Sequence, residues 1–273
     1  MFIHYLITRF NLKITGAGPE GMTSVEMTEE WLDIRLNLFL KYCVPSVLEQ
    51  TNKNFTWLIY FDKSTPTSIT NQISFLQNQF PGTILVFVDD FASMLTDISS
   101  RIKSSHSPYV ITSRLDNDDL ISNSFIEDIQ NSFLPEHNLI LNFNSGFEFS
   151  AWDHVMKKWN NRPHNQFISL IEDVNKLSNG SIYSFPHWKA PRIGRIININ
   201  GEPHWIYLRH ANNYSEQAVR ALPVFSKKNL TMFPASIRHA KLSMINTLWY
   251  SIQWIPVIIS SKTRRFFARK KLS

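Results

Sequence analysis

The sequence is poor in the residues that define several large protein classes. Its 273 residues include one cysteine, 8 glycines and 13 prolines. The lone Cys43 cannot form an internal disulfide or a cysteine-based zinc site, which favours a reducing compartment. Scarce glycine and proline, with no short-period repeat, exclude collagen-like, low-complexity and solenoid architectures. The 43% of residues that are hydrophobic instead predict a large core in one or two domains.

The N-terminal segment also lacks the features of a secretory signal. Its first ten residues, MFIHYLITRF, have no basic n-region and no cleavage site, and the apolar run is shorter than an h-region. We therefore expect this segment to be the first strand of a cytoplasmic protein.

Positive charge is concentrated at one end of the chain. Of the 28 lysines and arginines, six lie in residues 262–273, which contain no acid, so residues 1–261 hold 22 basic and 22 acidic residues. A neutral body with a basic tail does not provide the broad phosphate-binding surface of a nucleic-acid-binding protein. We expect no nucleic-acid partner.

The first half of the chain alternates between strand and helix patterns. Apolar runs typical of buried strands lie at residues 2–7, 57–61, 84–88 and 109–112. Helical spacing or capping signals lie at residues 29–43 (with Thr28 as N-cap and Pro45 as a kink or restart), 92–103 and 124–134 (with Ser124 and Glu127 spaced as a capping box). This alternation predicts a Rossmann-like α/β fold, whose ligand crevice lies at the carboxyl ends of the strands.

From residue 139 the pattern changes to short strands between loops rich in Asn, Pro, Trp and His. The expected strands are residues 139–143, 147–152, 167–171, 196–199 and 205–208. We predict one domain over residues 1–239, with a nucleotide-type half (1–134) and a second half (135–239) that provides a second substrate site. Residues 240–273 form a separate amphipathic and basic C-terminal segment.

Three carboxylates follow the predicted strand 109–112, namely Asp116, Asp118 and Asp119. Acids this close repel one another, and a divalent cation relieves the repulsion. An EF-hand is excluded because Ile121 occupies the position that requires glycine. An ordinary acidic turn before a helix is the plain alternative.

Arg114 lies two residues before Asp116, so an extended chain places both side chains on the same face. A cation and an acid facing one crevice suit a diphosphate with Mn²⁺ or Mg²⁺. No glycine-rich phosphate loop follows any predicted strand, so phosphate binding must rest on side chains and metal.

Three motifs in order resemble family 2 glycosyltransferases of the GT-A fold. Residues 46–51 and 54–62 are similar to their "SxxxQT" and "NF, apolar strand, Asp" segments, and residues 115–119 (LDNDD) are similar to their DxD motif. The TRFN start, the helix 31–50 and the segments 167–170 and 205–212 resemble, more narrowly, a family of rhamnosyltransferases. The resemblance covers roughly residues 2–215 and implies a mixed central sheet flanked by helices.

The resemblance also implies roles for individual residues. Thr8 and Asp62 would line the nucleotide base and ribose, Asp116 would contact the ribose or diphosphate, and Asp118 would hold the metal. Because they also lie at strand ends, Arg9 and Arg114 are added to the donor-binding set. Lys63 follows Asp62 at a position where a second acid is common in the family, so the identity of the nucleotide base is left open.

An inverting transferase needs a carboxylate that accepts the proton of the acceptor hydroxyl. Glu172 and Asp173, which end the predicted strand 167–171, are the first candidates, followed by Glu148 and Asp153. His210 is a candidate third metal ligand or, in the plain alternative, a hydrogen-bonded core histidine.

Trp188 and Trp205 are candidates for an acceptor-binding platform, because aromatic faces pack on the apolar faces of sugar rings. Buried core tryptophans are the alternative.

The C-terminal segment combines apolar and basic residues. Polar residues interrupt the stretch 242–259, so a membrane-spanning helix is marginal. Apolar residues at helical spacing, followed by six cations, predict peripheral contact with an anionic inner membrane surface, with a helix packed on the domain as the alternative.

Together these patterns predict a metal-dependent glycosyltransferase of bacterial surface polysaccharide synthesis. It would move a sugar, with rhamnose as the first candidate, from a nucleotide-diphosphate sugar to a glycan or lipid-linked glycan. A metal-dependent nucleotidyltransferase and a catalytically silent glycan- or membrane-binding module are the alternatives.

Overall fold

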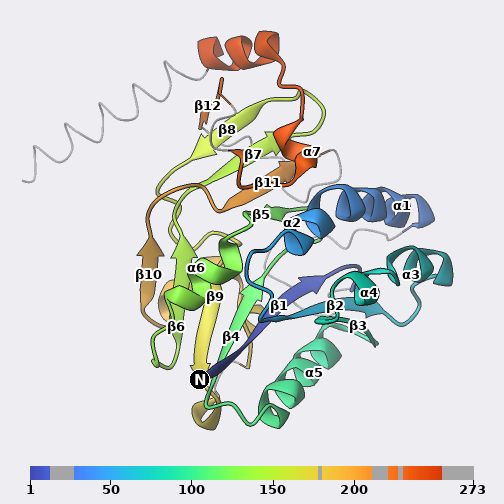
Figure 1. Ribbon diagram of the computed structural model, residues 1–273, viewed down its shortest axis with the longest axis vertical. Helices are drawn as coiled ribbons and strands as arrows, with labels where there is room; N and C mark the ends of the chain where they lie inside the picture. Colours follow the sequence, from blue (N-terminus) through green and yellow to red (C-terminus); the bar gives the residue numbers. More distant parts are fainter. Residues whose placement is uncertain (13–27, 178–179, 211–220, 227–229, 254–273) are drawn as a thin grey trace, which may run out of the picture.

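The computed structural model describes residues 1–12, 28–177, 180–210, 221–226 and 230–253. Within these residues the chain forms a seven-stranded sheet and a five-stranded sheet (Figure 1). The larger sheet contains β1 (Phe2–Arg9), β2 (Thr56–Asp62), β3 (Thr83–Val88), β4 (Tyr109–Arg114), β6 (Leu139–Phe143), β9 (Ser169–Asp173) and β10 (Ile196–Ile199). The smaller sheet contains β5 (Leu120–Ile121), β7 (Gly146–Ser150), β8 (Met156–Trp159), β11 (Trp205–Arg209) and β12 (Leu222–Pro223).

The helices lie mainly in the first half of the described chain. They are α1 (Glu29–Leu38), the π-helix η1 (Phe39–Cys43), α2 (Val44–Leu48), α3 (Thr67–Ile73), α4 (Leu76–Gln79), α5 (Phe91–Ser104), α6 (Phe125–Asn131) and α7 (Ala235–Arg238). Three 3₁₀ turns follow β9, namely η2 (Val174–Lys176), η3 (Ile182–Ser184) and η4 (His187–Arg192). Residues 244–253 form one more helix, called the C-terminal helix below.

The larger sheet is mixed. Its order is β10-β6-β9-β4-β1-β2-β3. β1 pairs in parallel with β2 and β4, and β2 pairs in parallel with β3, whereas β9 runs antiparallel to both β4 and β6. The expected mixed α/β fold with helices flanking a central sheet is therefore confirmed. The predicted half 135–239 supplies β6, β9 and β10 to the central sheet, and it supplies β7, β8, β11 and β12 to the smaller sheet.

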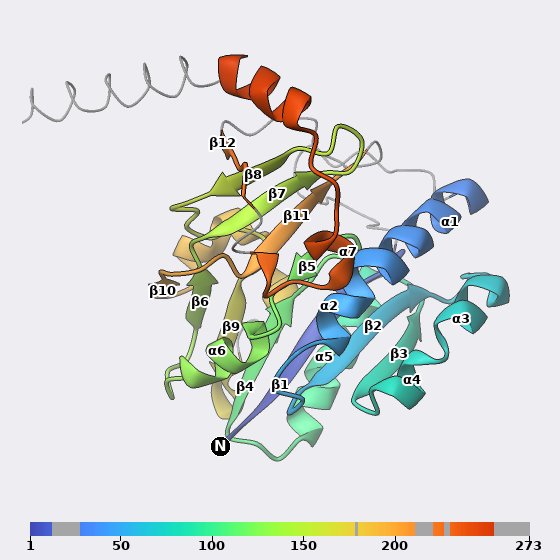
Figure 2. The ribbon, with the colours of Figure 1, turned by 45° about the horizontal axis from the view of Figure 1, so that its top comes forward.

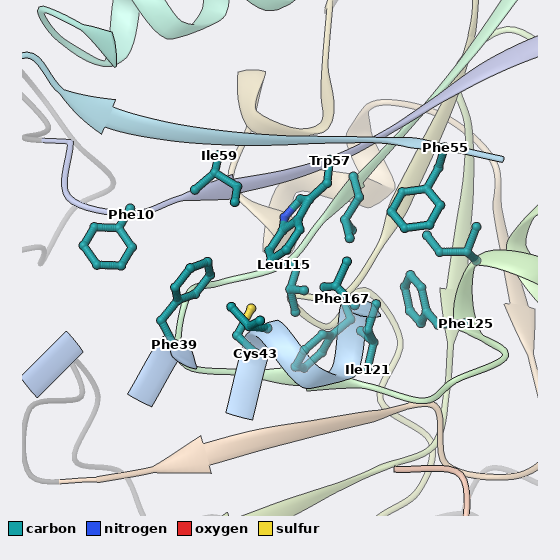
Figure 3. Packing of buried hydrophobic residues seen from close by; sticks show 14 of the residues in the cluster. Phe10, Phe39, Cys43, Phe55, Trp57, Ile59, Leu115, Ile121, Phe125 and Phe167 are labelled. Atoms are coloured by element: carbon teal, nitrogen blue, oxygen red, sulfur yellow. The ribbon is translucent and has the colours of Figure 1, made fainter. Parts of the chain in front are cut away.

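The main core lies between the sheet and the helical segment 29–48. Figure 3 shows Phe39 and Cys43 from this segment directed toward Trp57 of β2 and Leu115. All four side chains have no exposed surface, and the ring centroids of Phe39 and Trp57 are 5.7 Å apart. Burying a side chain of this size contributes roughly 1.5–3 kcal/mol, so this contact fixes the segment on the sheet.

The start of α1 agrees with the sequence pattern, and Pro45 lies inside a continuous helical segment. Thr28 Oγ1 accepts a hydrogen bond from the backbone N–H of Trp31 at 3.2 Å. Pro45 lies in the first turn of α2, immediately after the π-helix, where its missing N–H has little cost. The helical segment runs without a break from residue 29 to residue 48, and the π-helical turn before Pro45 accommodates the proline.

The start of α6 differs from the prediction. The helix begins at Phe125, as the spacing indicates, but the side chain of Ser124 makes no capping hydrogen bond. Gln50 caps the helix instead, because its Oε1 accepts from the Ile126 N–H at 3.0 Å. Its Nε2 donates to the carbonyls of Ser46 and Ser122, at 2.8 and 2.6 Å. One side chain thus joins α2, β5 and α6.

The two sheets are connected by residues 115–119, which we call the acidic loop. This loop leaves β4 in the larger sheet and leads into β5, which pairs antiparallel with β11 in the smaller sheet. The acidic residues therefore lie where the chain passes from one sheet to the other.

Candidate functional site

The centre of the candidate site is Asp118 in the acidic loop. Its side chain is buried, forms an ion pair with Arg35 and makes a hydrogen bond with His210, two residues from distant parts of the chain. Nη1 of Arg35 donates to Asp118 Oδ2, and the same oxygen lies 2.7 Å from His210 Nε2. Burial alone would raise the pKa of Asp118, but Arg35 and His210 outweigh it and lower the pKa. Asp118 is therefore held as a carboxylate.

Arg35 is the main site residue that sequence reasoning missed. It lies on α1, is buried, and also donates from Nη1 to Asn117 Oδ1 at 3.2 Å. Its guanidinium carbon lies 5.2 Å from the ring centroid of Trp31. A signal was present, since Arg35 follows Trp31 by four residues and so falls on the apolar stripe of the predicted helix. An arginine in that stripe indicates a buried acidic partner.

His210 is brought to Asp118 by β11. Two residues earlier, the Leu208 N–H donates to Asp119 Oδ1 at 2.9 Å, which ties this strand to the acidic loop. The structure thus places next to each other the two residues that were proposed to share a metal. Burial, followed by the charges of Asp118 and Asp116, raises the pKa of Asp119 well above its usual value.

The first acid of the motif, Asp116, pairs with Arg114. Arg114 Nη2 donates to both carboxylate oxygens of Asp116, at 3.1 and 2.9 Å. The guanidinium carbon also lies 5.2 Å from the ring centroid of Tyr183 in η3. Both side chains of the pair remain partly exposed, so a ligand can reach them.

The donor set suits a divalent cation that takes its remaining ligands from substrate. Among the described residues, no group of three or more His, Cys, Asp and Glu side chains is arranged to hold a metal. The pair of Asp118 and His210 supplies one carboxylate and one imidazole, which are ordinary ligands of Mn²⁺. Mg²⁺ too is commonly held by one or two carboxylates together with substrate phosphates. A metal held by these two residues would exchange their mutual hydrogen bond for bonds to the ion and would need further ligands from substrate.

A small pocket lies at the carboxyl ends of β1 and β2. The acidic loop is tied to this end of β1, because Asn117 Nδ2 donates to the Phe10 carbonyl at 2.7 Å. Its volume is about 160 Å³, and it is lined by Asn11, Glu29, Leu32, Asp62, Ser64, Thr65 and Pro66. Asp62 Oδ1 accepts from the Ser64 N–H at 2.8 Å, and Asn11 Oδ1 accepts from the Asp62 N–H at 3.1 Å. Asp62 thus lines a polar pocket, and its contact with a nucleotide stays a prediction. Arg9 ends β1, with its guanidinium carbon 5.9 Å from the ring centroid of Phe91.

Thr8 does not line this pocket. Its side chain has no exposed surface, and its Oγ1 accepts from Trp57 Nε1 at 3.0 Å. The prediction for Thr8 is wrong because alternate residues of a central strand point into opposite layers, and this one points into the core.

The predicted catalytic bases, Glu172 and Asp173, lie at the opposite end of the strands from the acidic loop. β9 runs antiparallel to β4, and Glu172 and Asp173 are opposite Val110 and Tyr109, at the start of β4. The acidic loop follows the end of β4, five residues from Tyr109, which is roughly 17 Å away at about 3.3 Å per residue. The prediction is wrong because it treated the end of β9 as if the strand ran parallel to β4.

The two predicted platform tryptophans have different environments. Trp205 has no exposed surface and stacks on Phe167, with ring centroids 4.9 Å apart and planes at 12°. It is a core residue, and its predicted contact with an acceptor is wrong. Trp188 in η4 is 49% exposed. Burial lowers the pKa of its neighbour His187, whose Nδ1 lies 2.9 Å from the His164 carbonyl oxygen.

Tyr207 is affected by the charges of the acidic loop and by that of Glu148 on β7. Burial raises its pKa, and the charges of Asp119, Asp118 and Glu148 raise it further. Glu148 is buried on β7, opposite Tyr207 in the strand register, and its Oε1 lies 3.0 Å from Lys157 Nζ. Burial raises the pKa of Glu148 against the opposing effect of Lys157.

Comparison with solved structures gives distant similarities. Crystal structures of S. aureus TarS 1–349, alone and in complex with UDP-GlcNAc, are 13% and 12% identical, with TM-scores of 0.42 and 0.43. The first match covers 76% of this chain and 60% of that chain, and the second covers 93% and 71%. HddC from Yersinia pseudotuberculosis is 10% identical, with a TM-score of 0.32, over 72% of this chain and 90% of that chain. The chain thus spans less than two thirds of the first TarS structure.

Sequence comparison is more specific. No curated protein sequence matches the chain significantly. Residues 4–222, which include β1, the acidic loop and His210, match a family model described as "Putative rhamnosyl transferase". This match covers most of the chain, and the chain belongs to that rhamnosyl transferase family.

Proposed function

We propose that the protein is a glycosyltransferase of bacterial surface polysaccharide synthesis, which moves a sugar from a nucleotide-diphosphate donor to a glycan or lipid-linked glycan. Rhamnose is the first candidate sugar, and the cytoplasm is the proposed location. The observation that carries the proposal is the placement of Asp116 and Asp118 at the end of β4, with Arg114, Arg35 and His210 paired to them. Family membership supports the same reaction class.

The donor is proposed to lie between the pocket at Asp62 and the acidic loop. Arg114 faces the crevice with part of its surface exposed, so it can donate hydrogen bonds to diphosphate oxygens. Asp118 and His210 would hold Mn²⁺ or Mg²⁺, which when bound would stabilise the charge on the departing nucleoside diphosphate. Arg35 keeps the Asp118 carboxylate ionised and fixed in direction.

An inverting reaction, which we favour, requires a base on the acceptor side. Glu172 and Asp173 lie at the far ends of the strands, so Glu148 is the next candidate. It lies opposite Tyr207 in the register of β7 with β11, the strand that leads to His210. Its raised pKa favours proton acceptance. Replacing Glu148 with Gln should lower kcat by about 10²–10⁴-fold and leave donor KM unchanged. The partly exposed Asp153 provides the comparison variant, Asp153→Asn.

The test of the proposed function is donor binding and sugar transfer. Nucleotide-activated rhamnose and other activated sugars are screened for a rise in unfolding temperature, with and without Mn²⁺, because a ligand that binds the folded state stabilises it. The selected donor is then used in a transfer assay. Asp118→Asn should abolish both metal-dependent binding and transfer.

The control is Asp89→Asn, which removes an exposed carboxylate that follows β3 at the same edge of the sheet. It should leave binding and transfer unchanged, and circular dichroism verifies that both variants are folded. If no activated sugar binds while glycans do, the protein is a glycan-binding module and the proposal fails.

A further inference from the structure

The C-terminal helix exposes its apolar side. Five large apolar residues between positions 244 and 253 are more than half exposed, with exposed fractions of 54, 80, 52, 60 and 68%, for Met244, Ile245, Leu248, Trp249 and Ile252 respectively. At 100° per residue these positions fall within one stripe along the helix. Soluble proteins rarely expose a continuous apolar stripe, and where they do it marks an interaction site.

The polar side of the same helix is attached to the protein. Thr247 and Ser251 are buried, and Asn246 Nδ2 donates to the Asp153 carbonyl at 2.8 Å. Lys157 Nζ of β8 lies 4.3 Å from the ring centroid of Tyr250. These contacts hold the polar side of the helix against the protein, so the apolar stripe faces outward.

The position of the helix leaves the stripe accessible. Figures 1 and 2 show it at one end of the molecule, next to β8 and away from the sheet of seven strands. In sequence it is followed by residues 254–273, which lie outside the described residues and contain six lysines and arginines and no acid.

We propose that this stripe, called the membrane face below, inserts into the surface of an anionic lipid bilayer. Apolar side chains that include Trp249 suit the boundary between headgroups and acyl chains, where tryptophan is enriched. The six cations that follow suit anionic headgroups. The same cations would repel those of a second copy, which disfavours a dimer through this face. No helix in the described part of the chain is long and apolar enough to cross a bilayer.

The experiment is co-sedimentation of the full chain with phosphatidylcholine vesicles that contain either no phosphatidylglycerol or 30% of it. The wild type should bind the anionic vesicles at least ten-fold more tightly than the neutral ones, and the binding should weaken with added salt. Trp249→Ser/Ile252→Ser should reduce binding to anionic vesicles at least ten-fold. Removal of residues 262–273 should abolish the preference for anionic vesicles.

A matched control removes apolar surface elsewhere. Leu134 and Phe75 are exposed and lie outside the membrane face. Leu134→Ser/Phe75→Ser should bind vesicles as the wild type does, and the unfolding temperatures of both double variants should stay near that of the wild type. Equal vesicle binding by wild type and Trp249→Ser/Ile252→Ser would overturn the proposal. So would a wild-type dimer in light scattering that the same substitutions convert to a monomer.

Discussion

At the scale of single residues, the pair of Arg35 and Asp118 has the greatest energetic consequence. Both side chains are buried, so removing one leaves the other charge with fewer partners in a poorly solvated place. Arg35→Met should therefore lower the free energy of unfolding by about 3–5 kcal/mol, measured by urea denaturation.

A double-mutant cycle separates this effect from lost packing on Trp31. Arg35→Met/Asp118→Asn should cost clearly less than the sum of the two single substitutions, because it removes both charges. Strictly additive costs would show that the two side chains do not stabilise each other.

His4 should make stability depend on pH. It is buried, and burial lowers its pKa from 6.5 to about 3. The amide nitrogen of Gln130 donates to the Asn54 carbonyl and to His4 Nδ1, so Nδ1 is an acceptor. The proton of the imidazole therefore lies on Nε2, which donates to Ser113 Oγ at 2.8 Å. The folded state thus keeps the imidazole neutral, whereas the unfolded chain protonates it near pH 6.5.

Because the folded pKa is depressed, the contribution of His4 is complete above pH 6.5 and is lost as the pH falls toward 3. The slope approaches about 1.4 kcal/mol per pH unit. Urea denaturation between pH 4 and 8 should show this slope in the wild type and a smaller one in His4→Gln. Parallel curves for the two proteins would refute the assignment.

Residue-level prediction from the sequence succeeded where motif and spacing carried the information. The spacing of Arg114 and Asp116 anticipated their shared face, and the structure pairs them. Arg35 was missed because its partner Asp118 is 83 positions away, and no local pattern names a partner at that separation. Trp205 was misjudged because composition does not distinguish a buried tryptophan from a surface one.

At the scale of elements, Gln50 joins three segments through three buried hydrogen bonds. Each such bond contributes about 1 kcal/mol. Gln50→Ala should therefore lower the free energy of unfolding by about 2–3 kcal/mol, as measured by urea denaturation.

Gln72 on α3 provides the matched control, because it is exposed and its amide makes a bond within its own helix. Gln72→Ala should change stability by less than about 0.5 kcal/mol. Equal effects of the two substitutions would mean that Gln50 is not a clamp between segments.

Element prediction worked best for the buried parallel strands, whose continuous apolar runs at β2 and β3 are distinctive. It failed for β8, where Lys157 and Lys158 hide a strand whose first lysine is buried against Glu148. The contact between Lys157 and the buried Glu148 depends on tertiary structure, and the local sequence does not indicate it.

At the scale of the whole molecule, the direction of β9 decides which carboxylates can take part in the reaction. Asp173 lies at the edge of the sheet away from the acidic loop. Asp173→Asn should therefore leave kcat and donor KM within about two-fold of the wild type, whereas a catalytic base is worth about 10²–10⁴-fold. A loss of that size in a sugar-transfer assay, with folding intact, would contradict this placement.

The mixed α/β class was predictable because it depends on the order of strands and helices. The antiparallel insertion of β9 between β4 and β6 was not, because local patterns give the position of a strand but not its direction or its neighbours. Choosing the catalytic base required the direction of β9, which the sequence does not give.

The acidic loop contacts strands of both sheets. It follows β4 of the larger sheet, and Leu208 and His210 tie it to β11 of the smaller sheet. A chimera that exchanges the second half of this chain for that of a relative would therefore also exchange His210, whose Nε2 lies 2.7 Å from Asp118 Oδ2. New acceptor preferences would have to be introduced by altering loops around an unbroken β4, β5 and β11, and not by exchanging whole modules.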